Sequence, residues 1–237
     1  MSKNFTCVLV KPQLGENIGA TARVLKNFGF SKLILINPRD GWPNKKAEST
    51  SSGAIDIIKK TKIFDDTKKA LGEYNLVFSF SARKRSLEKK HLKFKEFLNI
   101  VKRKRKAKIG LVFGPESTGL TNLELSLTDY IVSIPTSKFN SINLSHSVNI
   151  VFYEIFKTFL KDKRISHKKL LSLKKRDLYS FTDLLIKNLE IKNFFEPKEK
   201  KRSMVLNINN LFNKLQINDK ELRILASIVS ALSKNKF

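Results

Sequence analysis

The stretch IPTSKFNSINLSHSV, residues 134–148, decides how this chain folds. An apolar run ends there at Pro135, and a strand should stop with it because proline cannot donate a ladder hydrogen bond. Serine and asparagine side chains follow and compete for the backbone, which favours a polar loop and a helix cap. An apolar-periodic helix begins at Leu144. Such strand–loop–helix junctions bind ligands in open α/β sheets, although a well-capped helix start explains this stretch equally well.

Short apolar strands and amphipathic helices alternate on both sides of this stretch. The predicted strands are residues 5–10, 30–36, 62–64, 76–80, 109–113 and 130–134. The predicted helices are residues 18–27, 52–59, 65–72, 92–101 and 144–160. Strands separated by helices predict an α/β domain over residues 1–160, with a mainly parallel sheet and helices on both faces.

Capping signals predict several helix ends. Asn17 is expected to cap the first helix, and Gly29 is expected to follow its last turn. Asp65 is expected to cap the helix over residues 65–72. Thr121 and Glu124 have the spacing of a capping box, which predicts a further helix start after the strand at residues 109–113.

The composition changes after Leu160. Residues 161–169 are predicted to form a solvated linker, and helical patterns follow over residues 170–195, 204–215 and 219–233. Residues 196–203 carry no apolar side chain except Pro197 and are expected to form a loop. We therefore expect residues 161–237 to be a small all-helical extension, which is basic because it holds 19 basic and 8 acidic residues.

The charge of the chain indicates a polyanionic partner. The formal net charge is +26, far from the average, while a hydrophobic content of 41% is enough for a proper core. A genome-wide compositional bias also raises net charge, so the location of the charge is more informative than its total. Residues 83–108 hold 13 basic and 2 acidic side chains, a net +11 in one short segment. This clustering favours nucleic acid as the partner.

Other classes of protein are not favoured. Cys7 is the only cysteine, which indicates a reduced compartment and a cytoplasmic location. The N-terminus lacks a secretory signal pattern, and no apolar run approaches the roughly 20 residues of a membrane span. His91, His146 and His167 are scattered, so we expect no metal site.

Three loop segments that follow predicted strands carry residues suited to chemistry, but each is weak alone. Gly15 and Gly19 hint at a phosphate loop, yet their spacing fits neither a P-loop nor a dinucleotide fingerprint. Glu116 could instead be a loop carboxylate that binds backbone N–H groups. Arg23 could instead be an ordinary surface charge. The segments are residues 17–23, 114–120 and 140–145.

Together, in this order and spacing, these segments resemble the SPOUT superfamily of RNA methyltransferases, and in detail the tRNA 2′-O-methyltransferases of the TrmJ type. The motifs of that family are N-x-G-x-x-A-R, F-G-x-E-x-x-G-L and S-x-N-L-S. The first motif is matched by Asn17, Gly19, Ala22 and Arg23. The second is matched by Phe113, Gly114, Glu116, Gly119 and Leu120, and the third by Ser141, Asn143, Leu144 and Ser145. The stretch from Ser81 to Arg83 is also similar to the family. The resemblance covers about residues 4–160.

The resemblance implies a fold that spacing alone does not predict. Residues around 134–160 would be threaded through an earlier loop as a C-terminal trefoil knot, an exception to the rule against threaded connections. The resemblance also implies a homodimer with each active site at the subunit interface, and S-adenosyl-L-methionine bound in the knot. The implied cofactor-binding residues are Phe80, Ser81, Ala82, Gly114, Glu116, Ile134, Asn140, Ser141, Ile142 and Leu144.

The implied reaction is methylation of a ribose 2′-OH in tRNA, at nucleotide 32 of the anticodon loop. The implied catalytic residues are Arg23, Ser141, Asn17 and Glu116. A guanidinium group stays protonated in proteins, so we expect Arg23 to position a phosphate and stabilise charge on the 2′-oxygen. We expect Ser141 to orient the hydroxyl or relay its proton.

Two other functions fit the sequence less well. A non-catalytic RNA-binding protein on the same scaffold would have no use for all three motifs together. An enzyme that acts on nucleotide phosphates through residues 15–19 would lack the lysine and the acidic partners that such chemistry requires.

Overall fold

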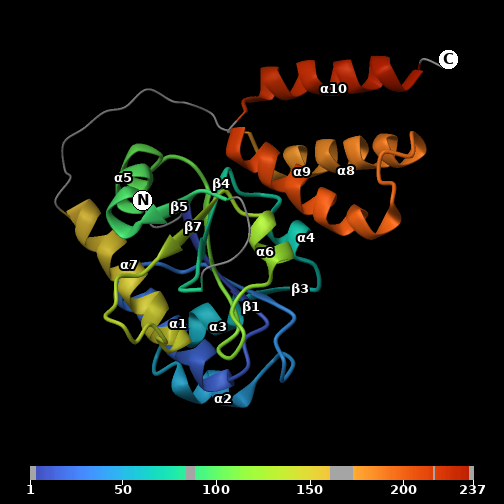
Figure 1. Ribbon diagram of the computed structural model, residues 1–237. Coiled ribbons are helices and arrows are strands. Elements are labelled where there is room, and N and C mark those ends of the chain that lie inside the picture. Colours follow the sequence, from blue (N-terminus) through green and yellow to red (C-terminus); the bar gives the residue numbers. More distant parts are fainter. Residues whose placement is uncertain (1–3, 84–88, 161–172, 216, 235–237) are drawn as a thin grey trace.

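A seven-stranded sheet forms the centre of the computed structural model, which describes residues 4–83, 89–160, 173–215 and 217–234 (Figure 1). The strands are β1 (Phe5–Val10), β2 (Leu33–Ile36), β3 (Lys62–Phe64), β4 (Leu76–Phe80), β5 (His91–Lys93), β6 (Ile109–Phe113) and β7 (Tyr130–Ser133). Their order is β3-β2-β1-β6-β4-β7-β5, and every neighbouring pair is parallel. The predicted parallel sheet is confirmed.

Helices cover both faces of the sheet, as predicted. Alternate residues of β1 enter different cores: Cys7 and Leu9 pack into one, Val8 and Val10 into the other. The helices on the first face are α1 (Gly15–Asn27), α2 (Lys45–Thr50), α3 (Ile55–Lys59), α5 (Phe94–Arg103) and α7 (Leu144–Leu160). Those that contribute to the second core are α4 (Thr67–Leu71), α6 (Asn122–Ser126) and α8 (Lys175–Ile191).

Two capping predictions are confirmed and two are wrong. Gly29 follows α1 with a positive φ of 72°, and Thr121 forms a reciprocal capping box at α6. Asp66 rather than Asp65 caps α4, since its carboxylate accepts the N–H of Lys69 at 2.8 Å. Asn17 is not a cap, because α1 already begins at Gly15 and the Asn17 side chain bonds elsewhere.

Two short elements were not predicted from the sequence. The segment expected to be helical from residue 92 starts as strand β5, which pairs with β7 at the edge of the sheet. Leu92 is the only buried side chain of β5, so three residues give no periodicity to detect. Helix α2 is also short, with Ala47 as its only buried residue, and it precedes the predicted helix, which is observed as α3.

Glycines let α1 and α2 approach closely. A Cβ atom added at Gly19 would lie 2.1 Å from Thr50 Oγ1 and 2.3 Å from the Ala47 carbonyl oxygen. One added at Gly15 would lie 2.2 Å from Asn44 Oδ1. Both glycines lie inside a helix and serve its packing, so the structure gives no support to a phosphate loop at residues 15–19.

The C-terminal residues that the structure describes are helical, as expected. After α8 come a 3₁₀ turn (Lys198–Lys200), α9 (Lys201–Leu215) and α10 (Asp219–Lys234). The loop expected at residues 196–203 is thus largely helical. Leu178 and Phe181 of α8 form a small apolar core with Leu222 of α10. The predicted linker at residues 161–169 lies outside the described residues.

A buried polar cluster joins these helices to the sheet; it consists of Lys89, Asp129, Lys175, Asn210 and Asn213. Lys175 Nζ forms an ion pair with Asp129 Oδ1, and both side chains are only 5% exposed. Lys175 Nζ also donates to Asn213 Oδ1 at 2.7 Å. The cluster therefore ties α8 and α9 to the start of β7.

Lys89 completes the polar cluster from the other side. Its Nζ donates to the Leu125 and Ser126 carbonyl oxygens of α6 at 2.6 and 3.0 Å, and to Asn210 Oδ1 of α9 at 3.4 Å. Burial lowers the pKa of Lys89 to about 7, although the carboxylate of Asp129 acts in the opposite direction.

Candidate active site

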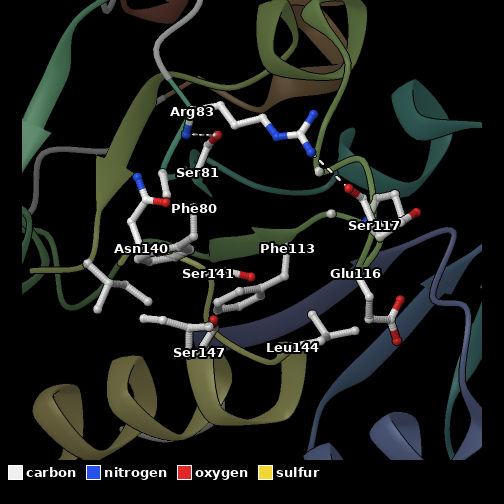
Figure 2. Close-up of a pocket in the computed structure, with 16 residues that line it drawn as sticks. Phe80, Ser81, Arg83, Phe113, Glu116, Ser117, Asn140, Ser141, Leu144 and Ser147 are labelled. Carbon is white, nitrogen blue, oxygen red and sulfur yellow. Dashed lines mark hydrogen bonds between the residues drawn. The ribbon is translucent and has the colours of Figure 1, made fainter. Parts of the chain in front are cut away.

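A cleft of about 280 Å³ lies at the carboxyl ends of β4, β6 and β7 (Figure 2). The parallel register brings the loops after these strands to the same edge of the sheet, where such folds bind ligands. All ten residues implied to bind the cofactor line this cleft. They are Phe80, Ser81, Ala82, Gly114, Glu116, Ile134, Asn140, Ser141, Ile142 and Leu144.

Two stacked rings line the cleft at the strand ends. Phe80 and Phe113 are register partners in β4 and β6, and their ring centroids lie 4.7 Å apart with an interplanar angle of 9°. Both side chains are buried. Because register fixes one ring against the other, this part of the wall is rigid and apolar.

The loop after β6 folds tightly against itself at Gly114. A Cβ atom there would lie 2.4 Å from the Leu120 backbone nitrogen and 2.7 Å from the Gly119 carbonyl carbon. Gly119 itself has a positive φ of 64°, which favours glycine. Any side chain at Gly114 must therefore displace the backbone that forms one wall of the cleft.

If the cleft holds the S-adenosyl-L-methionine that the family resemblance implies, Gly114→Val should weaken its binding by at least about tenfold, because overpacking costs roughly 1–3 kcal/mol and here moves a wall of the cleft. Isothermal titration calorimetry measures the affinity. Thr118→Ala, an exposed change on the same loop, is the matched control and should bind normally. Unchanged affinity in Gly114→Val would place the cofactor elsewhere.

One chain of hydrogen bonds joins the three motif loops. Glu116 accepts from Asn17 Nδ2 at 2.7 Å and from the Gln13 backbone N–H at 2.8 Å. Asn143 Nδ2 donates to Asn17 Oδ1 at 3.1 Å, and Asn143 Oδ1 accepts the Ser145 N–H at 2.9 Å at the start of α7. The Glu116 carboxylate points away from the centre of the cleft (Figure 2). Its alternative role, a loop carboxylate that binds backbone N–H groups, is confirmed.

Beyond the ten residues implied to bind the cofactor, six further described residues line the cleft: Arg83, Phe113, Pro115, Ser117, Gly119 and Ser147. Arg83 lies at the rim, where its Nη2 donates to the Ser117 carbonyl oxygen at 2.8 Å (Figure 2). A signal for Ser147 existed, because it lies three residues after Leu144 on the same helix face. Arg83 follows Ser81 and Ala82 in the stretch that is similar to the family, and it is also the first residue of the basic segment at residues 83–108.

Arg23 lies apart from the other implied catalytic residues. It is exposed on α1 and does not line the cleft of the described chain. Ser141 lines the cleft, while Asn17 and Glu116 are joined by their hydrogen bond. The single chain thus assembles three of the four residues and leaves the guanidinium on an outer face.

The described residues contain no group of three or more His, Cys, Asp or Glu side chains placed to hold a metal ion. Among the helices in the described part of the chain, none combines the length and apolar character needed to cross a membrane.

The lining chemistry fits a cofactor with an adenine ring and a zwitterionic tail. Apolar side chains, serine hydroxyls and loop backbone make up most of the wall, and the charged side chains are Arg83 and Glu116. Comparison with known proteins decides the family: the model of the SpoU rRNA Methylase family matches residues 4–153.

The chain belongs to the SpoU rRNA Methylase family.

Several named relatives align with nearly the full length of the chain. The tRNA (cytidine/uridine-2'-O-)-methyltransferase TrmJ of Pectobacterium atrosepticum is 33% identical, over 99% of this chain and 98% of that protein. The tRNA (cytidine-2'-O-)-methyltransferase TrmJ of Methanocaldococcus jannaschii is 31% identical, over 94% and 97%. The crystal structure of TrmJ from Z. mobilis ZM4 superposes with a TM-score of 0.88 and 30% identity, over 97% and 99%. The TrmJ-type resemblance is confirmed.

Proposed function

We propose that this chain methylates the ribose 2′-OH of nucleotide 32 in the tRNA anticodon loop, with S-adenosylmethionine as the methyl donor. The cleft carries this proposal, because it gathers three motif loops at one sheet edge with a lining suited to that cofactor. The TrmJ relatives, named as tRNA 2'-O-methyltransferases, support the substrate class. The rival function is a non-catalytic RNA-binding protein that retains the scaffold.

The residues of the cleft divide into binding and positioning roles. Phe80, Ile134 and Leu144 line the cleft and would give the cofactor apolar contacts, while loop backbone at Gly114 and Ile142 would give it polar groups. The cofactor supplies a methyl group already activated by a sulfonium. Little remains for the protein except to align donor and acceptor, and alignment alone accounts for large rate gains.

Asn17 and Glu116 act as positioning residues in this proposal. Their side chains are occupied by each other, by the Gln13 N–H and by Asn143. They hold the start of α1 and the loop before α7 against the cleft wall. Ser141 lines the cleft. In this proposal its hydroxyl orients the ribose 2′-OH or relays its proton.

Arg23 supplies the electrostatic part of the mechanism from a second copy of the chain. A guanidinium remains protonated, so it stabilises negative charge that develops on the 2′-oxygen instead of removing the proton. Arg23 is exposed on α1 and outside the cleft of its own chain. A homodimer with the active site at its interface would bring Arg23 of one subunit to the cleft of the other.

The contact between the C-terminal end of α1 and α7 has the chemistry of a subunit interface. Phe28, which directly follows α1, packs against Tyr153 and Phe156 of α7, with ring centroids 5.6 Å apart in both pairs. Tyr153 nevertheless remains 45% exposed. Exposed aromatic clusters mark interaction sites on many proteins, and aromatic side chains are enriched in interfaces.

We expect Tyr153→Glu to convert the dimer to monomers, because a charge would be buried in that apolar contact. Light scattering after size exclusion should give the mass of one chain for the variant and of two for the parent. Tyr153→Phe, which keeps the ring, should remain dimeric. A dimeric Tyr153→Glu variant would move the interface away from α7.

The basic segment at residues 83–108 and the C-terminal helices bind tRNA phosphates in this proposal. Counterion release then dominates affinity, so the dissociation constant for tRNA should rise at least about a hundredfold between roughly 50 and 200 mM salt. Filter binding at several salt concentrations measures the slope. A flat salt profile would contradict phosphate binding by this surface.

Two further features belong to the same proposal. The loop at residues 134–144 and α7 would form the trefoil knot that the family resemblance implies. The cytoplasm, where tRNA is modified and a lone thiol such as Cys7 stays reduced, would be the site of action.

The decisive experiment combines cofactor binding with methyl mapping. Calorimetry should detect S-adenosylmethionine binding, and a tRNA transcript should acquire a methyl group at the nucleotide 32 ribose. A transcript with a 2′-deoxy nucleotide 32 should acquire none, while a 2′-deoxy nucleotide 34 should leave methylation intact. Cofactor binding without transfer would favour the RNA-binding protein, and absence of both would reject the proposal.

A further inference from the structure

A second hollow lies at the carboxyl ends of β2 and β3, and we call it the β2–β3 groove. Its volume is about 550 Å³, and none of its lining residues belongs to the cleft. It is lined by Asn37, Pro38, Trp42, Ile63, Phe64 and Asp65, together with Gly41. A hollow of this size accommodates one planar ligand of nucleobase dimensions with room to spare.

Aromatic and apolar side chains of the groove pack against the protein core on one side and are exposed to solvent on the other. Trp42 is half-buried and packs against the core on the α1 face of the sheet, and Phe64 packs against the core on the opposite face. Ile63, on the edge strand β3, is 43% exposed. Rings fixed on one side and open on the other are platforms for stacking.

The groove is joined to the cleft through one loop. Arg39, between the groove residues Pro38 and Gly41, donates its backbone N–H to the Pro12 carbonyl oxygen at 3.1 Å. The neighbouring Gln13 N–H in turn binds Glu116 at 2.8 Å. The hydrogen bond that Arg39 donates to the Asp40 carboxylate raises the pKa of Arg39, and the carboxylate of Glu116 acts in the same direction. The groove therefore lies beside the loops that build the cleft.

The charges near the groove suit a nucleic acid. Lys45 and Lys62 are exposed. In the sequence, Lys45 lies three residues after Trp42, and Lys62 directly precedes Ile63. They can attract phosphates, while the 80% exposed carboxylate of Asp65 can accept hydrogen bonds from the amino group of a base. Unpaired RNA bases are recognised in this manner, by stacking on aromatic rings and hydrogen bonding at their edges.

We propose that the β2–β3 groove binds an unpaired nucleobase of the RNA substrate, which stacks on Trp42 and contacts Phe64 at the groove wall. This inference rests on the proposed function, since it assigns to the groove a loop nucleotide other than the one that is methylated. Binding there would fix the register of the loop over the cleft. The groove then selects RNA with an unpaired base at a set spacing from the target ribose.

The chain provides its own probe, because Trp42 is its only tryptophan. Tryptophan emission therefore reports on this groove alone. Titration with an anticodon stem-loop should quench the emission, since a stacked base quenches indole fluorescence. A fully paired RNA duplex of the same length should bind by its phosphates and leave the emission nearly unchanged. Equal quenching by the duplex would overturn base stacking, and quenching by polyglutamate but not by RNA would assign the groove to an acidic protein partner.

Variants test the same groove by kinetics. Trp42→Leu should raise KM for the stem-loop about tenfold, the size expected for one lost base–aromatic stack, with affinity for S-adenosylmethionine unchanged. Trp42→Phe keeps a ring and should retain most of the parent KM. Phe64→Leu is a second, independent variant with the same expected direction.

The outcomes separate this inference from the proposed function. Methyl transfer with unquenched emission and an unchanged KM in Trp42→Leu would reject the groove and leave the methyltransferase intact. Absence of methyl transfer in the parent would reject the proposed function itself. Quenching of the parent by the stem-loop needs no variant, so the test survives if Trp42→Leu fails to fold.

Discussion

Arg23→Gln is expected to lower the turnover number for methyl transfer by at least about a hundredfold, the loss typical of removing one group that stabilises an oxyanion. Glutamine keeps most of the length of the side chain but removes the charge. Arg23 is exposed and lines no part of the cofactor cleft in its own chain, so S-adenosylmethionine should bind with affinity within about twofold of the parent. The substitution should therefore lower turnover without lowering cofactor affinity.

Single-turnover methyl transfer and calorimetry measure the two quantities. Arg23→Lys retains a charge without the planar fork and should fall between the parent and Arg23→Gln. Parallel losses of turnover and cofactor affinity would mean that Arg23 shapes the cofactor cleft, and the electrostatic role would then be wrong.

Asp129→Ala is expected to lower the free energy of unfolding by about 3–5 kcal/mol, because it leaves the buried ammonium of Lys175 without its counter-ion. Both side chains are 5% exposed, so solvent does not screen the loss. The change also removes the acceptor for the Val77 N–H, which Asp129 Oδ2 now binds at 2.7 Å. The contacts of α8 and α9 with the sheet should loosen first.

Urea denaturation followed by circular dichroism measures this loss. Asp56→Ala removes an exposed ion pair with Lys26, in which the side chains are 52% and 50% exposed, and should lower stability far less than Asp129→Ala because solvent screens the pair. The double variant Asp129→Asn with Lys175→Met removes both charges and should be more stable than Asp129→Ala. A double variant that is less stable would contradict an uncompensated charge as the cause.

The sequence was most informative where apolar residues formed long runs. Strands β1 and β6 and helix α7 were predicted at their observed bounds, because buried parallel strands and a long helix need continuous apolar patterns. The cleft residues were predicted through the motifs, not through periodicity. Loops such as residues 114–120 carry no pattern that locates them in space.

The parts that the sequence did not predict depend on distant partners. Asn17 has the chemistry of a helix cap, and only the fold shows that it bridges Glu116 and Asn143, 99 and 126 residues away. Strand β5 has one buried residue, so its pairing with β7 overrides its local preference. The ion pair of Asp129 with Lys175 likewise joins charges that local sequence assigns to solvent.

The most direct test of an active site shared between two subunits uses a heterodimer whose two chains carry different substitutions. One chain carries Arg23→Gln and an intact cleft, and the other carries Gly114→Val and an intact Arg23. Co-expression with two affinity tags and tandem purification isolates the mixed dimer. With S-adenosylmethionine below the dissociation constant of the parent, the Gly114→Val homodimer should retain at most about a tenth of the parental methyl transfer, and the Arg23→Gln homodimer at most about a hundredth.

If Arg23 acts across the interface, the mixed dimer holds one complete site and should show about half of the parental methyl transfer to tRNA. If Arg23 acts within its own chain, neither site is complete and the mixed dimer should be as inactive as the two variant homodimers. That inactive result, from a heterodimer that is correctly assembled and folded, would contradict an active site shared between two subunits.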